Sequence, residues 1–315
     1  MGFALVLIAG GLVALFLGGE LLLRGAVTVS RKLGISELLI GLTIVGFGTS
    51  LPELLVSTRA SLDGQPGIAI GNAVGSNIAN VILIVALAAL VRPPEGWSRT
   101  VKRDALVMIG ASVLLLALAA FGVISRLTGV VLVAALLAYL VLAFLQERSA
   151  PPPPVETEQG AGGGNIGIAL VSLLGGFAVL FFGAEWLVEG ASALARQFGI
   201  SEAVIGLTIV AVGTSLPELA TSVLAAYRGK TDVALGNIVG SNIFNILGIL
   251  GIAGLIAPIP IADKFVSFDI PVMLGIAVLF GAALVFARRI GRVVAGLMLL
   301  AYGSYVAAQF APVVV

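Results

Sequence analysis

The sequence predicts an all-α membrane protein of ten transmembrane helices, arranged as two inverted repeats of five helices. Three observations lead to this fold class. Hydrophobic side chains make up 59% of the 315 residues and charged ones 10%, whereas soluble domains average about 45–50% and about 25%. A bilayer-crossing helix needs about 20 apolar residues, so the chain has room for about ten spans. The third observation is an internal duplication at a fixed offset.

Hydropathy, interrupted by charged and Pro/Gly clusters, predicts the spans in order. They cover residues 2–23, 37–62, 68–91, 104–121, 127–146, 166–188, 201–227, 233–257, 269–287 and 290–308. The first span has no basic region before it and no small-residue cleavage site after it, so we expect a retained helix. After the fifth span, a run of prolines and then glycines predicts an extended linker. The predicted units are a first repeat over 1–148, a linker over 149–165 and a second repeat over 166–315.

The two repeats share a sequence pattern at an offset of 165 residues. Residues 34–57 (GISELLIGLTIVGFGTSLPELLVS) align without gaps on residues 199–222 (GISEAVIGLTIVAVGTSLPELATS), with 18 of 24 positions identical. Residues 71–80 (GNAVGSNIAN) align on residues 236–245 (GNIVGSNIFN), with 8 of 10 identical. Fainter matches include Met108 with Met273. Because five is an odd number of spans, the second copy should enter the membrane in the opposite orientation.

The loop charges predict how the chain is oriented. With the N-terminus outside, the inner loops collect thirteen of the seventeen basic residues, and the outer side keeps only Arg59, Arg126, Arg196 and Lys264. An excess of Lys and Arg is typical of cytoplasmic loops. We therefore expect a multi-pass protein of the plasma or inner membrane, with both termini outside and the central linker in the cytosol.

Missing residue types exclude several function classes. The chain has no cysteine and no histidine, which excludes disulfides, thiolate chemistry, the usual zinc sites and His-based catalytic triads. A net charge of +1 gives no reason to expect a nucleic-acid partner, and nothing indicates an obligate protein partner or a cofactor. We expect a protein that is not an enzyme, since no nucleophile–base arrangement suits an intramembrane hydrolase.

Two carboxylates lie inside predicted spans, where an ionised side chain is costly and by default functional. Glu53 and Glu218 each end the motif Gly-Thr-Ser-Leu-Pro-Glu, and no Lys or Arg stands at mid-depth in these spans to pair with them. Inverted repeats would bring the two glutamates together near the midplane. Pro52 and Pro217 lack an N–H and clash with the carbonyl four residues earlier, so each should kink its helix and free backbone carbonyls.

Hydroxyl and amide side chains recur near these glutamates at helical spacing. Thr49 and Ser50 precede Glu53 by four and three residues, so their hydroxyls can lie on its side of the helix. In the third and eighth spans, a serine and an asparagine four residues later share a helix face. Carboxylate, hydroxyl, amide and carbonyl oxygens suit Ca²⁺ or Na⁺ and are poor ligands for zinc or copper.

Formal charge extends this interpretation to transport. Two ionised glutamates carry a charge of about −2, which one Ca²⁺ neutralises, whereas Na⁺ needs two ions to do the same. Competition for one carboxylate pair makes occupancy by the two ions mutually exclusive. Exclusive occupancy combined with alternating access gives antiport.

At these residues the chain resembles the sodium/calcium exchanger family of the cation/Ca²⁺ antiporter superfamily, in its prokaryotic form without a regulatory domain. The resemblance rests on two copies of GTSLPE, each followed by GN-x-VGSNI-x-N, and extends over nearly the whole chain. It implies Na⁺/Ca²⁺ exchange, with Glu53 and Glu218 as central Ca²⁺ ligands shared with Na⁺. The further ion ligands that it implies are Thr49, Thr214, Ser50, Ser215, Ser76, Ser241, Asn80, Asn245, Gly46 and Ala211.

Several alternatives stay open. Asn80 and Asn245 stand where some relatives, including K⁺-dependent exchangers, carry Asp, which favours exchange without K⁺. A Ca²⁺/H⁺ antiporter and a cation channel remain alternative functions. Close helix packing is an alternative role for Ser76 and Ser241. A further set of amides is expected to hydrogen-bond the broken helices rather than bind ions: Asn72, Asn77, Asn237 and Asn242.

Overall fold

The computed structural model describes residues 2–94, 99–148, 165–199, 211–287 and 289–309. Nearly all of the described residues are helical, apart from a short antiparallel pairing of β1 (Val123–Ile124) with β2 (Ile259–Pro260). Six stretches of the described chain are helices long and apolar enough to cross a membrane, and the bent pair Glu37–Thr49 and Leu51–Leu62 makes a seventh. The chain is therefore a helical membrane protein, and the count of ten spans remains a prediction.

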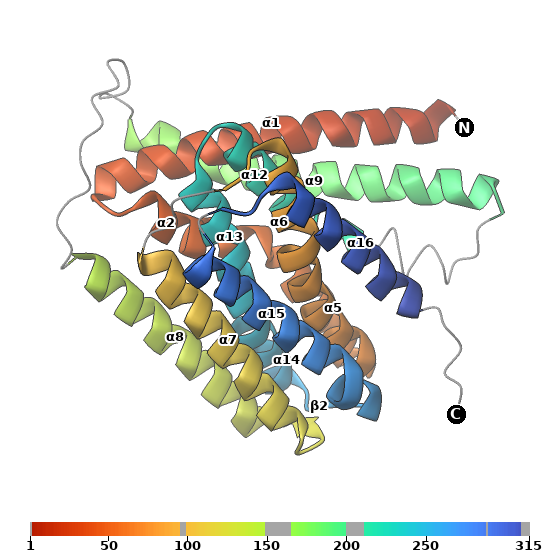
Figure 1. Cartoon of the computed structure of the whole chain (residues 1–315). Helices are drawn as coiled ribbons and strands as arrows, with labels where there is room; N and C mark the ends of the chain where they lie inside the picture. The colour runs from red at the N-terminus through yellow and green to blue at the C-terminus, as the bar shows by residue number, and fades with distance from the viewer. Residues whose placement is uncertain (1, 95–98, 149–164, 200–210, 288, 310–315) are drawn as a thin grey trace.

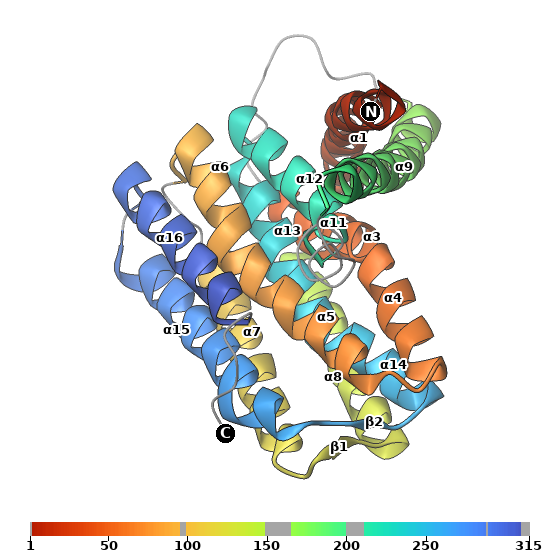
Figure 2. The same cartoon turned by 90° about the vertical axis from the view of Figure 1, so that its right-hand side faces the viewer.

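Two long helices lie side by side and antiparallel, and they run in a different direction from the remaining helices (Figures 1 and 2). They are α1 (Gly2–Leu33) and α9 (Ile166–Gln197). Glycines let their backbones meet, because a Cβ on Gly176 would lie 2.5 Å from the backbone nitrogen of Leu22. Small residues permit this kind of close approach between helices in membranes.

Both long helices extend past residues 23 and 188, where hydropathy ends the first and sixth predicted spans. Arg24 and Glu189 interrupt the apolar run, but a charged residue at the end of a span does not stop a helix. The helices end shortly before Gly34 and Gly199, which have φ of +65° and +77°. A glycine in this left-handed conformation is a common helix stop.

The helix that carries Glu53 is broken, as Pro52 predicts. It consists of α2 (Glu37–Ile40), the π-helical η1 (Gly41–Val45), α3 (Gly46–Thr49) and α4 (Leu51–Leu62). The chain bends by 44° between α3 and α4. In the second half, α11 (Ala211–Gly213) and α12 (Leu216–Tyr227) are interrupted in the same way before Pro217.

Two central helical stretches hold the core. The first is α5 (Pro66–Ala79), η2 (Asn80–Ile84) and α6 (Val85–Val91), and the second is α13 (Thr231–Ile243), η4 (Phe244–Ile249) and α14 (Leu250–Ile256). They are the most buried of the membrane-length helices that the structure describes. Each changes from α to π geometry at or next to a candidate asparagine ligand, and such π segments are frequent at functional sites.

The outer layer packs around these central helices. It consists of α7 (Arg99–Ala119), α8 (Arg126–Arg148), η5 (Phe265–Asp269) with α15 (Ile270–Phe286), and α16 (Arg292–Gln309). Helix α7 packs on α15, α8 on α14, and α16 on α6. The β1–β2 pairing joins the two halves at one end of the molecule (Figure 2). Elsewhere, the Ile290 amide donates to the Pro94 carbonyl at 3.2 Å, which is a further contact between the halves.

Corresponding elements recur about 165 residues apart. The bounds of α4 and α12, for example, are residues 51–62 and 216–227, which is the offset of the sequence repeat. The predicted linker lies outside the described residues, except that the Asn165 side chain caps α9 by accepting the Gly167 amide at 2.7 Å.

Candidate ion-binding site

Both predicted glutamates are buried at equivalent places in the fold. Glu53 lies in the first turn of α4 and Glu218 in the first turn of α12, just after the two helix breaks, and each is 1% exposed. The N-terminal end of a helix favours negative charge. The breaks therefore place each carboxylate where the adjoining backbone stabilises its ionised form.

A reciprocal pair of hydrogen bonds links the two breaks. The Ser50 hydroxyl donates to Oε1 of Glu218 at 2.8 Å, and the Ser215 hydroxyl donates to Oε1 of Glu53 at 3.2 Å. Ser215 also lies 3.4 Å from the Ser76 hydroxyl of α5. Because each serine stands three residues before one glutamate and bonds the other, these bonds bring the two motifs together as one site.

Among the buried side-chain oxygens that have no hydrogen-bond partner within the described part of the chain, four belong to predicted ligands. They are Oε2 of Glu53, Oε2 of Glu218, Oδ1 of Asn80 and Oδ1 of Asn245. The four side chains are at most 1% exposed. Buried polar atoms are almost always paired, so an unpaired group calls for an explanation. Each of the four is a hard oxygen acceptor of the kind that Ca²⁺ and Na⁺ prefer.

A second group of predicted ligands meets at the Gly46 carbonyl. It accepts the Ser241 hydroxyl at 3.2 Å and the Ser50 amide at 3.3 Å. The Thr49 hydroxyl lies 3.4 Å from the same carbonyl and 3.1 Å from Oδ1 of Asn237. The structure thus joins Gly46, Thr49 and Ser241 across the two halves of the chain.

The remaining two predicted ligands are placed only by their elements. Thr214 lies in the break before α12, and Ala211 begins α11.

Two asparagines hold the broken helices, as the sequence predicts. Asn72 donates to the Glu53 carbonyl at 3.0 Å and to the Ser57 hydroxyl at 2.9 Å. In the other half, Asn237 donates to the Glu218 carbonyl at 3.4 Å and to the Ser222 hydroxyl at 2.8 Å. Each bond pair fixes the backbone of a glutamate. Ser57 and Ser222 were not among the predicted site residues, although each stands one helical turn after its glutamate and at the same offset.

The other two asparagines differ from the prediction. Asn77 and Asn242 do not bond the broken helices in the contacts described. Instead they connect the two central helices, since the Asn77 amide donates to the Asn242 carbonyl at 3.2 Å. Their side chains also contact the thioether sulfurs of Met273 and Met108. The sequence carried one signal for these methionines, because they match at the repeat offset.

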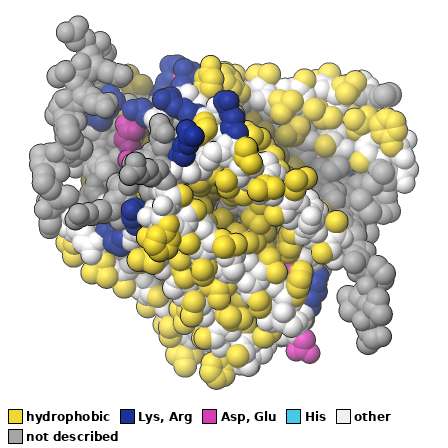
Figure 3. All heavy atoms as spheres, in the orientation of Figure 1, with side chains coloured by type: hydrophobic (Ala, Val, Ile, Leu, Met, Phe, Trp, Pro, Cys, Tyr) yellow, Lys and Arg dark blue, Asp and Glu magenta, His cyan; other side chains and the backbone are white. Residues whose placement is uncertain are grey.

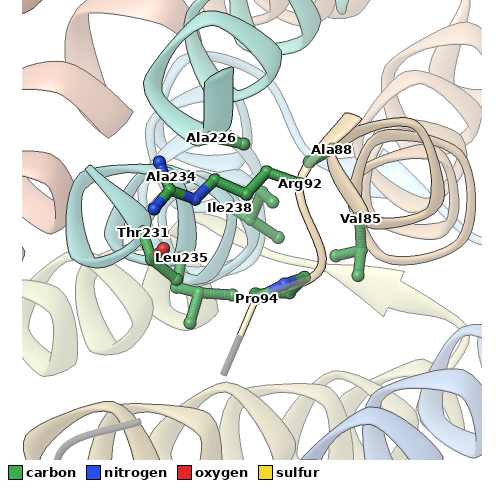
Figure 4. A pocket seen from close by; sticks show the side chains of 9 residues that line it. All are labelled: Val85, Ala88, Arg92, Pro94, Ala226, Thr231, Ala234, Leu235 and Ile238. Carbon is green, nitrogen blue, oxygen red and sulfur yellow. The ribbon is translucent and has the colours of Figure 1, made fainter. Parts of the chain in front are cut away.

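A small pocket elsewhere is distinct from this site. It lies between α6, α12 and α13, and its lining is mostly apolar, with Arg92 along one wall (Figure 4). Neither glutamate lines it. The polar cluster at Glu53 and Glu218, rather than this pocket, has the chemistry of a cation site.

The fold is that of a helical membrane protein that encloses two buried carboxylates among neutral side-chain oxygens. Within the described residues, no group of three or more acidic, His or Cys side chains forms a metal centre. The family model described as "Sodium/calcium exchanger protein" matches residues 3–145 and 168–311. The chain belongs to the sodium/calcium exchanger family.

Individual relatives are similar over nearly their whole length. The chain is 37% identical over 312 residues to the inner membrane protein YrbG of Escherichia coli, covering 97% of this chain and 95% of the relative. It is 35% identical over 308 residues to the sodium/calcium exchanger MaX1 of Methanosarcina acetivorans, covering 85% and 87%. A solved structure of the sodium-calcium exchanger NCX_Mj, soaked with Na⁺ and Ca²⁺, superposes with a TM-score of 0.84 at 31% identity, covering 97% of this chain and 98% of that one. This chain is therefore a cation/Ca²⁺ antiporter by family.

Proposed function

We propose that the chain exchanges Na⁺ for Ca²⁺ across the membrane, by alternating access to one site built around Glu53 and Glu218. The observation that carries this proposal is the set of four unpartnered oxygens on Glu53, Glu218, Asn80 and Asn245. Two come from carboxylates and two from amides, which is a ligand set for a hard cation. Reciprocal bonds from Ser50 and Ser215 hold the carboxylates of the two halves at one place.

The charge of the site supports exchange rather than simple binding. The two glutamates are buried, and the described basic side chains form their ion pairs with other acids, such as Glu20 with Arg228 at 3.0 Å and Glu37 with Lys230 at 3.0 Å. Two ionised glutamates then need two positive charges, from one Ca²⁺ or two Na⁺. Loading with one kind of ion excludes the other, so release of one becomes the condition for transport of the other.

The proposed positions for Na⁺ lie beside the glutamates and use Thr49, Ser76, Ser241 and Gly46. Ser76 adjoins Ser215, and Ser241 adjoins the Gly46 carbonyl. We assign flanking Na⁺ positions to these two places, with Thr214 and Ala211 as the counterparts of Thr49 and Gly46 in the second half. Neutral Asn80 and Asn245 keep the site charge at −2, which favours exchange without K⁺.

For the fold we propose ten spans in two inverted five-helix repeats, residues 1–148 and 166–315, joined by a cytosolic linker. The recurrence of the same hydrogen bonds at the repeat offset supports this arrangement, as in Asn72 to Ser57 and Asn237 to Ser222. An inverted copy would place the two helix breaks back to back at mid-depth.

For the orientation we propose both termini outside a plasma or inner membrane. Basic side chains gather toward one end of the visible face, around α6 and α12 (Figure 3). In this part of the molecule the Arg292 side chain donates to the Leu90 carbonyl at 3.1 Å. Lys264, by contrast, donates to the side chain of Gln309 on α16, near the end of the molecule where β1 pairs with β2. Clustering of Lys and Arg on one side supports assignment of that side to the cytosol.

The test is ⁴⁵Ca²⁺ uptake into proteoliposomes that contain the full-length protein. One set of vesicles is loaded with Na⁺, a second with K⁺ or choline, and a third carries an imposed pH gradient. We expect uptake only with internal Na⁺. Uptake driven by the pH gradient would instead identify a Ca²⁺/H⁺ antiporter, and uptake indifferent to both gradients would identify a channel.

A further inference from the structure

A buried layer of amide and thioether side chains lies next to the proposed ion site, between the central helices and the outer helices α7 and α15. Asn77 and Asn242 project from the two central helices, and Met108 and Met273 from α7 and α15. All four are at most 3% exposed. The layer connects directly to the asparagines that carry unpartnered oxygens.

One chain of contacts runs from Met108 to Asn80. Nδ2 of Asn80 donates to Oδ1 of Asn242 at 3.3 Å, and Nδ2 of Asn242 donates to the sulfur of Met108 at 3.4 Å. The amide nitrogen of Asn80 is therefore engaged on the side of Asn242. Its oxygen is left over, and it is one of the four unpartnered oxygens.

An equivalent chain runs from Met273 to Asn245. Nδ2 of Asn245 donates to Oδ1 of Asn77 at 3.0 Å, and Nδ2 of Asn77 lies 3.6 Å from the sulfur of Met273. This chain has an additional acceptor, because the same nitrogen of Asn77 donates to the Asn242 carbonyl at 3.2 Å. The two halves thus share the same chain of contacts. The orientation of Asn242 depends more on its methionine than the orientation of Asn77 does.

The thioether of Met108 favours one orientation of the Asn242 amide. The two ends of a carboxamide have nearly the same shape, so its orientation is decided by its hydrogen-bond partners. A thioether sulfur accepts hydrogen bonds and donates none, so it selects the NH₂ end of Asn242. The gap that Asn77, Asn242 and the two methionines help to line has no room for a water molecule, so water cannot take over this role.

We propose that Met108 and Met273 are positioning residues of the ion site, which turn the amide oxygens of Asn80 and Asn245 toward the cation through Asn242 and Asn77. The inference rests on the proposed function, because the two asparagines are ligands only under that proposal. If Asn242 reversed, its NH₂ group would face the NH₂ group of Asn80. Asn80 would then have to turn its own NH₂ group toward the cation. The partial positive charge of that group repels the cation.

The test replaces each methionine by leucine, which conserves volume and removes the acceptor. The variants Met108→Leu and Met273→Leu are compared with Met298→Leu, whose methionine is half-buried on α16 and takes no part in the sulfur contacts described above. ⁴⁵Ca²⁺ uptake against external Ca²⁺ concentration gives the KM and the maximal rate for each. We expect Met108→Leu to raise the KM about three- to tenfold, the effect of losing one hydrogen bond. The maximal rate should stay within about twofold, because a misoriented ligand weakens Ca²⁺ binding and this appears as a higher KM.

Two further comparisons separate positioning from packing. Met273→Leu should raise the KM less than Met108→Leu, because Asn77 keeps a carbonyl acceptor. Met108→Gln, which restores an acceptor oxygen, should return the KM toward that of the unmodified protein. An unchanged KM in Met108→Leu, or an equal rise in Met298→Leu, would overturn the proposal.

A double variant tests the route through Asn80. In an Asn80→Asp background the carboxylate accepts at both oxygens, so Asn242 can turn to donate to it and no longer needs the sulfur. Adding Met108→Leu should then change the KM less than twofold, and a full three- to tenfold rise would overturn the proposal. Failure of the proposed function is recognised separately, as Ca²⁺ uptake that ignores internal Na⁺ or survives Glu53→Gln. The methionine comparison remains readable in that case, because it uses only the KM for Ca²⁺.

Discussion

Replacing Glu53 by glutamine removes half of the proposed site's charge and little else. The side chain is 1% exposed, and its Oε1 accepts from Ser215 at 3.2 Å. A glutamine keeps the volume and can keep this hydrogen bond through its amide oxygen. What changes is Oε2, the unpartnered oxygen, which becomes either a neutral oxygen or an NH₂ group.

The expected loss follows from the charge. Two unit charges 4 Å apart interact by about 4 kcal/mol at an effective dielectric constant of about 20, and the double charge of Ca²⁺ raises this to about 8 kcal/mol. If relaxation of the site recovers half of that, about 4 kcal/mol is lost, or about three orders of magnitude in Ca²⁺ affinity. Ca²⁺ transport at ordinary concentrations should therefore be abolished, and the same holds for Glu218→Gln.

The assay is ⁴⁵Ca²⁺ uptake into Na⁺-loaded proteoliposomes, with Glu37→Gln as the matched control. Glu37 pairs with Lys230 at 3.0 Å and is about a quarter exposed, and partly exposed ion pairs contribute little. Its uptake should stay within about twofold of the unmodified protein. Near-normal uptake in Glu53→Gln or in Glu218→Gln would refute the assignment of the site.

Two other substitutions test the ligand set and the helix packing. Asn80→Asp or Asn245→Asp adds a negative charge to a side chain that is at most 1% exposed, so competition by K⁺ and Na⁺ against Ca²⁺ uptake should change. Unchanged selectivity in both would place these asparagines outside the site. Gly176→Ala should lower the stability by about 1–3 kcal/mol through overpacking, since its Cβ would lie 2.5 Å from the Leu22 nitrogen. Gly175→Ala meets no atom within 4 Å and is the control, and equal melting temperatures for the two variants would contradict the close packing of α1 on α9.

Local chemistry made part of the fold predictable. The break before α4 follows from Pro52, whose ring and missing N–H act on its own helix whatever surrounds it. The long helices show the opposite case. Hydropathy stopped the first helix at Arg24, whereas its end is set by the left-handed conformation of Gly34. A charged residue such as Arg24 can end an apolar run without ending the backbone hydrogen bonding of the helix.

Some features of the candidate site could be predicted from the sequence, and others could not. Glu53 and Glu218 stand out as candidates in the sequence because an acid in an apolar span has few explanations other than function, and the structure buries both. The crossed bonds from Ser50 to Glu218 and from Ser215 to Glu53 join residues more than 160 positions apart, and no local pattern encodes such a pairing. The methionines next to Asn77 and Asn242 were missed for a related reason, since Met in an apolar helix usually signals only packing.

The central claim is that Ca²⁺ entry is coupled to Na⁺ exit at one shared site. Its most direct test follows ²²Na⁺ efflux and ⁴⁵Ca²⁺ uptake together in the same proteoliposomes. We predict that external Ca²⁺ accelerates Na⁺ efflux in step with its own uptake, and that Glu53→Gln abolishes both fluxes. Ca²⁺ uptake without accompanying Na⁺ efflux, or Na⁺ efflux that ignores external Ca²⁺, would contradict exchange at a shared site.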